Sequence, residues 1–143
     1  MTAEILKPVI VLAAWTMIMW LWMYIVRIPA ISGMPEDKSP NADVGWTSAK
    51  LEAALAPAVQ WKAHNYNHLH EAPTVFYAVA IVLAIAGGGD GLNATLAWAY
   101  VGLRVIHSLW QSLVNKVMPR FALFTLSSLV LMALIVNAAL LLF

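Results

Sequence analysis

Hydrophobic and polar residues are distributed along this chain in long blocks. Four stretches, at about 5–28, 48–87, 93–115 and 119–143, are dominated by apolar residues. Each contains the run of about 20 residues that a helix needs to cross a bilayer core, and none shows the short alternating pattern of a membrane β-strand. The pattern predicts an all-α fold, an integral membrane four-helix bundle that forms a single domain over residues 1–143.

The segments between these blocks have the composition of loops and turns. Residues 28–46 are polar and rich in Pro, Gly and Ser, Pro40 among them, residues 87–91 contain four glycines, and residues 116–119 form a short link. Thr47 or Ser48 is expected to cap the second helix. Pro73 lies within that helix, and we expect it to introduce a kink.

Composition identifies lipid as the solvent for this chain. Of its 143 residues, 62% are hydrophobic and 10% are charged, which is too little polar surface for a water-soluble globule of this size. The chain has no cysteine, so any thiol chemistry requires a thiol from outside. A formal net charge of +1 argues against a nucleic-acid partner, which would require a concentrated basic face.

The basic residues predict an orientation in the membrane. Six of them lie in or beside the first and third connections, whereas the opposite side holds only Lys7. Because cytoplasmic loops are enriched in Lys and Arg, both chain ends are expected on the non-cytoplasmic side, in the cell inner membrane if the source is bacterial. Such a small bundle has little interior, so we also expect it to oligomerise.

Polar residues recur inside the apolar blocks at three- and four-residue spacing, which places them on one face of each helix. Ionisable groups cost at least ~2.5 kcal/mol at the centre of a membrane, so each needs a partner, a cavity or a function. These residues are His64, Asn67, His68 and Glu71 in the second block, Tyr100, Arg104, His107, Ser108 and Gln111 in the third, and Arg120 and Ser127 in the fourth.

The polar stripes allow two interpretations that are compatible with each other. Glu71 and Arg104 can form a structural ion pair between the second and third helices. Arg104 and Arg120 can also bind an anionic ligand, because guanidinium groups meet carboxylates in bidentate geometry. For Ser127 and its neighbour Ser128 we expect hydrogen bonds to their own backbone.

A metal site at the three neighbouring histidines is a further alternative. His64 and His68 are four residues apart and can share a helix face, but His70 points elsewhere. No glutamate completes a His-Glu-x-x-His pattern, which disfavours metal binding.

Two segments of the chain resemble a known family of membrane proteins. They are Asn-His-Leu-His-Glu-Ala-Pro-Thr-Val-Phe-Tyr at 67–77 and Ala-Trp-Ala-Tyr-Val-Gly-Leu-Arg-Val-Ile-His-Ser at 97–108, followed by Asn115 and by Pro-Arg-Phe at 119–121. In order and spacing they are similar to bacterial members of the MAPEG family, the membrane-associated proteins of eicosanoid and glutathione metabolism. With Arg27 at the end of the first helix, the resemblance covers nearly the whole chain.

The resemblance implies a four-helix subunit of a homotrimer, with glutathione as co-substrate bound between neighbouring subunits near the cytoplasmic side. Arg120 would then be catalytic, because it would stabilise the glutathione thiolate. The residues that the resemblance implies for binding are Arg27, Asn67, His68, Glu71, Arg104, His107 and Gln111.

Four positions depart from the family pattern. His68 stands where the family has an asparagine, and His64 stands where it has an arginine. Gln111 replaces a tyrosine of several glutathione-using relatives, and Phe121 follows Arg120 in place of a serine.

Two functions from different classes follow from these features. The first is glutathione transfer to hydrophobic electrophiles, or glutathione-dependent reduction of lipid hydroperoxides, within the membrane. The alternative is a non-catalytic lipid-binding or scaffold protein of the same fold, which the residues at 111 and 121 favour. Transport is disfavoured because the four short blocks show neither an inverted repeat nor a pair of broken helices.

Overall fold

The computed structural model describes residues 3–39 and 45–143, so Pro40 and the adjoining part of the first connection lie outside the described residues. Across these two ranges the chain is helical and contains no β-strand, which confirms the all-α prediction. The elements are α1 (Leu6–Ser32), the 3-10 helix η1 (Glu36–Lys38), α2 (Ser48–Ala54), α3 (Pro57–His68), α4 (Ala72–Ile85), α5 (Leu92–Leu113) and α6 (Val117–Leu142).

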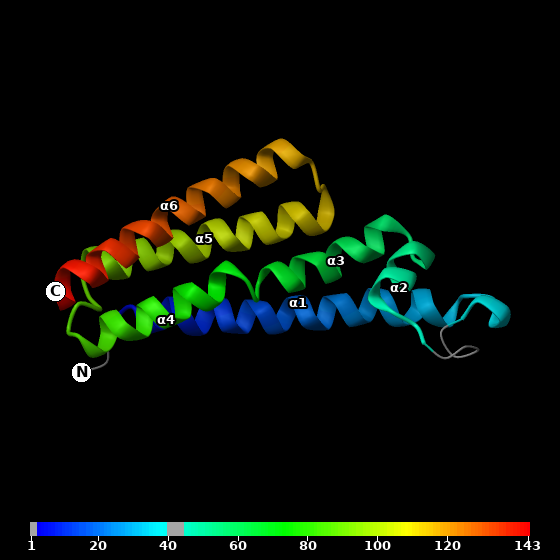
Figure 1. Cartoon of the computed structure of the whole chain (residues 1–143), viewed down its shortest axis with the longest axis horizontal. Helices are drawn as coiled ribbons and strands as arrows, with labels where there is room; N and C mark the ends of the chain where they lie inside the picture. The colour runs from blue at the N-terminus through cyan, green and yellow to red at the C-terminus, as the bar shows by residue number, and fades with distance from the viewer. Residues whose placement is uncertain (1–2, 40–44) are drawn as a thin grey trace.

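The long helices run side by side in an elongated bundle (Figure 1). α3 and α4 follow one another along α1, and the antiparallel helices α5 and α6 pack together as a hairpin. α5 also packs against α1 and α3, whereas α6 contacts α4. Both chain ends lie at one end of the bundle, and α2 lies at the other (Figure 1). The side of α5 that faces α3 is therefore enclosed by three helices.

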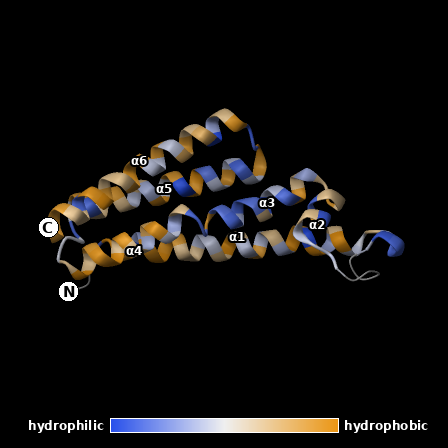
Figure 2. Cartoon of the chain, in the orientation of Figure 1, coloured by the Kyte–Doolittle hydropathy of each residue, from blue (hydrophilic) through white to orange (hydrophobic). Residues whose placement is uncertain are grey.

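Within the described residues, three helical stretches are long and apolar enough to cross a membrane: Leu6–Ser32, Pro57–Ile85 and Val117–Leu142. Hydrophobic residues dominate α1, α4 and α6 (Figure 2), and many of their large apolar side chains are exposed, as expected for helices that lipid surrounds. α5 has 22 residues, enough in length for a span, but it carries the polar stripe. The fourth span therefore stays a prediction.

The stretch 48–87, expected to be one helix kinked at Pro73, is divided into three helices. Thr47 caps α2, because its Oγ1 accepts a hydrogen bond from the backbone N–H of Lys50 at 3.3 Å. The chain then leaves the helix after His68 and re-enters it at Ala72. Pro73 lies in the first turn of α4. Backbone N–H groups in a first turn make no hydrogen bond within the helix, so the lack of an N–H in proline costs nothing there. The proline thus marks the start of a helix.

The apolar core lies toward the end of the bundle that carries the termini. Leu12, Met19, Phe76, Leu83 and Leu134 are fully buried there, and they come from α1, α4 and α6. Because lipid is as apolar as these side chains, van der Waals packing between the helices stabilises this core in the membrane. This packing fixes α4 and α6 beside α1 and so positions the polar segments that follow.

Candidate functional site

The polar stripe of α5 is almost entirely enclosed by the protein. Its residues recur every three or four positions, so their side chains lie on the side of α5 that packs against α3. Each retains no more than 3% of its surface: Tyr100, Arg104, His107, Ser108, Gln111 and Ser112. Such complete burial of polar groups indicates specific partners or bound molecules.

Arg104 is the buried cation of this stripe, with 1% of its surface exposed. Its NH2 group donates to the backbone oxygen of His68 at 3.1 Å. That carbonyl belongs to the last residue of α3, where helix carbonyls have no helical partner. The Nε and NH1 atoms of Arg104 are also buried, and they have no hydrogen-bond partner among the residues that the structure describes.

Glu71 is engaged with His68 instead of Arg104. Its Oε2 lies 2.9 Å from Nδ1 of His68, and no salt bridge to Arg104 is formed between the described parts of the chain. The predicted Glu71–Arg104 ion pair is therefore wrong. Because α3 ends at His68, the chain turns between His68 and Glu71 and brings the Glu71 carboxylate beside the His68 imidazole. The Arg104 guanidinium therefore stays available for another anion.

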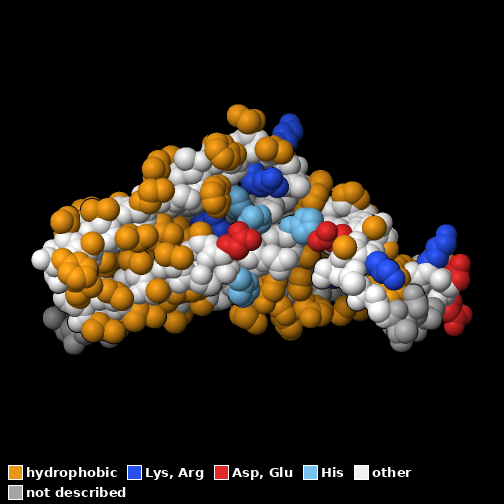
Figure 3. Space-filling model, in the orientation of Figure 1, with side chains coloured by type: hydrophobic (Ala, Val, Ile, Leu, Met, Phe, Trp, Pro, Cys, Tyr) orange, Lys and Arg blue, Asp and Glu red, His pale blue; other side chains and the backbone are white. Residues whose placement is uncertain are grey.

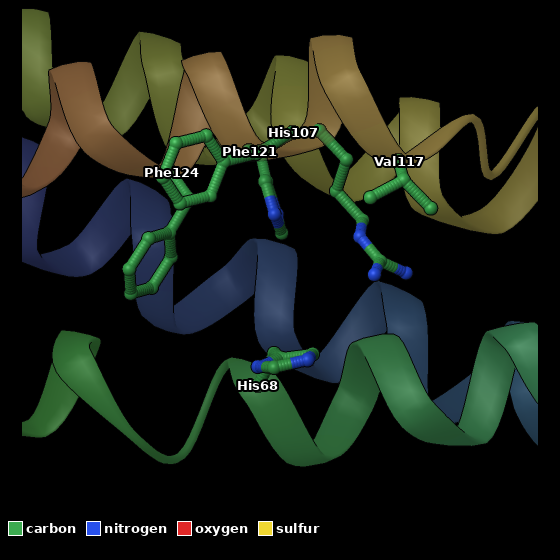
Figure 4. Close-up of a pocket in the computed structure, with 6 residues that line it drawn as sticks. His68, His107, Val117, Phe121 and Phe124 are labelled. Atoms are coloured by element: carbon green, nitrogen blue, oxygen red, sulfur yellow. The ribbon is translucent and has the colours of Figure 1, made fainter.

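A pocket of about 210 Å³ lies next to this pair of residues, between α3, α5 and α6. His68 and His107 point toward one another across it (Figure 4), with their rings 6.2 Å apart and nearly perpendicular. Phe124 adds an apolar wall, and its ring also lies 5.9 Å from the Arg104 guanidinium carbon. The residues that line the pocket are His68, His107, Val117, Arg120, Phe121 and Phe124.

Arg120 reaches this pocket from the first turn of α6. Its NH1 group donates to Oδ1 of Asn115 at 2.7 Å. Asn115 has a positive φ of 51° and terminates α5, where its N–H bonds back to the carbonyl of Trp110 at 2.8 Å. This left-handed conformation is one that asparagine tolerates better than most residues. The helix end thus orients the guanidinium along the pocket wall.

The other residues expected in the site lie apart from this pocket. Gln111 is buried one turn beyond His107, and Asn67 is exposed on α3. Arg27 lines a different pocket, of about 300 Å³, together with Trp46, Leu51 and neighbouring residues. The structure of the single chain therefore brings together His68, His107 and Arg120, with Arg104 behind them and Glu71 bound to His68.

The three neighbouring histidines point to separate partners. His64 bonds to Glu52 at 3.0 Å, and His70 bonds to the backbone oxygen of Tyr66 at 2.9 Å. No cluster of three or more His, Asp or Glu side chains with metal-binding geometry occurs within residues 3–39 and 45–143.

Sequence reasoning missed Val117 and Phe124, which line the pocket, and the role of Asn115, which binds Arg120. Phe124 lies four residues after Arg120 and so shares its helix face, a spacing that could have identified it. Asn115 appeared only as part of the family resemblance, and its role as the partner of Arg120 depends on the way α5 ends.

Figure 3 shows the surface that surrounds the site. Hydrophobic side chains dominate the end of the molecule near the termini, whereas histidine, basic and acidic side chains gather over the middle and toward the other end. Charged and histidine side chains are thus separate from the apolar end of the molecule.

The fold and the site together define an all-helical membrane protein with a cationic, partly aromatic pocket between its helices. The model of the MAPEG family matches residues 5–140, and the chain belongs to this family. Membership fits membrane-bound metabolism of glutathione or eicosanoids. No curated protein and no solved structure matches the chain.

Proposed function

We propose that this protein is a membrane-bound glutathione-dependent transferase or peroxidase that acts on hydrophobic electrophiles or lipid hydroperoxides. One observation carries the proposal: the Arg120 guanidinium lines a pocket together with two imidazoles and an apolar, partly aromatic wall, and the buried Arg104 guanidinium lies behind that wall, 5.9 Å from the Phe124 ring. An anionic tripeptide and an apolar second substrate both find complementary surface there.

Arg104 is suited to hold a carboxylate of glutathione. A buried guanidinium without a carboxylate partner is costly in a membrane, and an anionic ligand would offset that cost. The hydrogen bond from its NH2 group to the carbonyl of His68 holds the guanidinium in place, so the side chain loses little conformational freedom when glutathione binds.

Arg120 is suited to stabilise the thiolate. An unperturbed thiol has a pKa of about 8.5, and an adjacent guanidinium lowers it, so that more nucleophile forms at neutral pH. The thiolate sulfur then forms a bond to the electrophilic carbon of the second substrate and displaces its leaving group. In the peroxidase reaction the thiolate sulfur attacks the terminal peroxide oxygen, the O–O bond breaks, and the alcohol leaves with a proton. The glutathione sulfenic acid that forms then reacts with a second glutathione, which gives glutathione disulfide and water.

A second copy of the chain would complete the site. The pocket of about 210 Å³ is smaller than the roughly 300–1,000 Å³ usual for ligand sites. Val117, Met118 and Phe121 are more than 60% exposed on the adjoining turns of α6, where another subunit can cover them. We therefore propose a homotrimer of four-span subunits, with α5 as the fourth span, glutathione between subunits and both termini on the non-cytoplasmic side.

Thiolate formation tests this proposal directly. Glutathione added to the purified protein should produce the ultraviolet absorbance of a thiolate, and the Arg120→Ala variant should lose it. Lys116→Ala is the matched control, because Lys116 is an exposed cation in the same connection that does not line the pocket. Absence of a thiolate signal in the unmutated protein would contradict the assignment.

Phe121 favours a second candidate, a non-catalytic lipid-binding protein. Its side chain is 61% exposed beside the pocket, where an acyl chain could lie against it. Saturable fatty-acid binding without turnover of a chlorinated aromatic acceptor would support this candidate. Turnover of that acceptor with glutathione would exclude it.

A further inference from the structure

One wall of the pocket carries an imidazole that a carboxylate holds in place. Nδ1 of His68 lies 2.9 Å from Oε2 of Glu71, across the turn between α3 and α4. An ionised carboxylate only accepts hydrogen bonds, so Nδ1 carries the proton of this contact. The neutral ring therefore has an unprotonated Nε2, which is the form in which a histidine accepts a proton. The contact with Glu71 thus gives the pocket an oriented base.

This base shares its pocket with the Arg120 guanidinium. His68 enters the pocket from the end of α3, and Arg120 enters it from the first turn of α6. Because the pocket measures only about 210 Å³, a sulfur held against Arg120 also lies close to the His68 ring. A proton acceptor and a group that stabilises an anion are the two requirements for activating a thiol.

The charged and titratable groups around His68 come from three elements. Glu71 contacts the ring from the turn before α4, and Arg120 lies on α6. From α5, His107 faces the ring at 6.2 Å, and Arg104 donates to the His68 carbonyl at 3.1 Å. The carboxylate offsets the positive charge that the ring gains with a proton. Transfer from a thiol bound in the same pocket also leaves the total charge of the pocket unchanged.

His107 is the other imidazole of the pocket, and it is less suited to this role. It is 3% exposed, and its ring packs against those of His68 and Phe124. Within residues 3–39 and 45–143 no carboxylate forms a hydrogen bond with it, so nothing comparable to Glu71 orients it or offsets a charge on it. The geometry therefore favours His68.

We propose that His68, oriented by Glu71, is the proton shuttle of this site, and that lipid hydroperoxides are the substrate class that it serves. This inference rests on the proposed function, because the proton in question is that of the glutathione thiol. In the first step the S–H bond breaks, the proton moves to Nε2 of His68, and the sulfur keeps the electron pair as a thiolate beside Arg120.

The second step returns the proton. The thiolate sulfur attacks the terminal peroxide oxygen, the O–O bond breaks, and Nε2 of His68 protonates the departing alkoxide, which leaves as an alcohol. An alkoxide is a strongly basic leaving group that benefits from this proton, whereas chloride leaves without one. Glu71 acts through His68 and is a positioning residue. Loss of His68 should therefore impair hydroperoxide reduction more than displacement of chloride.

Counting protons tests the first step. Glutathione is added to the purified protein in weak buffer at about pH 7.5, where a free thiol with a pKa of about 8.5 keeps its proton. Thiolate is measured by its ultraviolet absorbance, and released protons are measured with an indicator dye. S-methylglutathione serves as the blank, because it has no thiol proton. The unmutated protein should form thiolate and release almost no proton beyond the blank.

His68→Asn should still form thiolate beside Arg120 but should release about one proton for each thiolate. The substitution keeps the backbone carbonyl that accepts the hydrogen bond from Arg104. His64→Asn is the matched control and should behave as the unmutated protein does. His64 lies four residues earlier on α3 and contacts Glu52 at 3.0 Å, but it does not line the pocket.

Glu71→Gln provides a second variant. The side chain of Glu71 makes no capping hydrogen bond to α4, so the helix should start as before. Proton release should rise toward one per thiolate, because the protonated ring loses the charge that offsets its own. Release as low as in the unmutated protein would contradict the positioning role of Glu71.

Turnover tests the second step. His68→Asn should lower the reduction of a fatty-acid hydroperoxide by about a hundredfold, the usual size of a lost general acid or base. Transfer to a chlorinated aromatic acceptor should fall much less. Equal losses in the two reactions would overturn the assignment of hydroperoxides.

The outcomes separate this inference from the proposed function. Thiolate accompanied by about one released proton in the unmutated protein would overturn the role of His68 alone. Absence of thiolate in the unmutated protein would overturn the proposed function, and the role of His68 with it.

Discussion

The end of the bundle near the termini and the half that contains Arg104 differ in how their polar groups are paired. Near the termini the polar groups are paired: Ile5 N–H donates to Gly89 at 2.8 Å, and Asn137 donates to Asn93 at 2.7 Å. Asn93 in turn donates to the carbonyl of Gly88 at 2.9 Å. In the half that contains Arg104, guanidinium nitrogens and amide oxygens are buried without partners within the described chain.

This difference separates stability from function along one set of helices. Satisfied hydrogen bonds and close packing stabilise the terminal end, where an unmade bond would cost about 1–3 kcal/mol without any gain. Unpaired groups in the other half carry the same cost, and they are retained where a ligand or water completes them. Substitutions in the two halves should therefore produce different phenotypes.

The largest effect is expected for Arg104→Met in the polar half. It removes the buried cation but keeps an unbranched apolar stem, so the affinity for glutathione should fall by about tenfold to a hundredfold, the equivalent of a charge-assisted hydrogen bond of ~1.5–3 kcal/mol. Calorimetric titration measures this. Arg104→Lys should restore only part of the affinity, because an ammonium cannot bind bidentately.

The matched control for this measurement is Lys116→Ala, which removes an exposed cation that does not line the pocket. Unchanged glutathione affinity in Arg104→Met would show that the buried guanidinium does not bind glutathione and only contacts the His68 carbonyl where α3 ends.

The next largest effect is expected for Gly89→Ala at the terminal end. A Cβ at Gly89 would lie 2.6 Å from Cβ of Ala3 and 3.1 Å from Cα of Ala84, which is backbone that cannot turn away. Overpacking of this kind costs about 1–3 kcal/mol. Thermal unfolding in detergent should show a lower midpoint, while the folded protein keeps its glutathione affinity.

Gly102→Ala is the matched substitution on α5, because a Cβ there meets nothing within 4 Å. In a helix this change should be neutral or stabilising by up to about 1 kcal/mol. Equal unfolding midpoints for the two variants would refute the close approach at Gly89.

Much of the fold was predictable because lipid imposes a simple rule on the sequence. The apolar blocks identified the helices, and the spacing of Arg104 and His107 correctly placed them on one buried face. The family prediction, made from segments on either side of the 87–91 turn, is confirmed. These features depend on short-range periodicity, which a single sequence records.

The interruption after His68 was not predictable in the same way. Pro73 is compatible both with a kink and with the first turn of a new helix, and local sequence does not decide between them. The interruption places Glu71 beside His68 and leaves Asn67 exposed, although all three fit one helical stripe. The location of Arg27 depends on how α2 folds back, which is a tertiary feature.

The smallest effect is expected for Asn137→Ala, and it defines the lower limit of the comparison between the halves. Asn137 of α6 donates to Asn93 of α5, and Asn93 also bonds to Gly88, so the variant removes one interhelical bond while Asn93 keeps its other bond. Interhelical hydrogen bonds in membrane proteins contribute only about 0.6 kcal/mol on average. The unfolding midpoint should fall slightly, and glutathione affinity should not change.

Asn67→Ala is the control, because it lies at an exposed position and should leave the midpoint unaltered. A loss of glutathione binding in Asn137→Ala would mean that the two halves are coupled, and that the paired end also determines the geometry of the pocket.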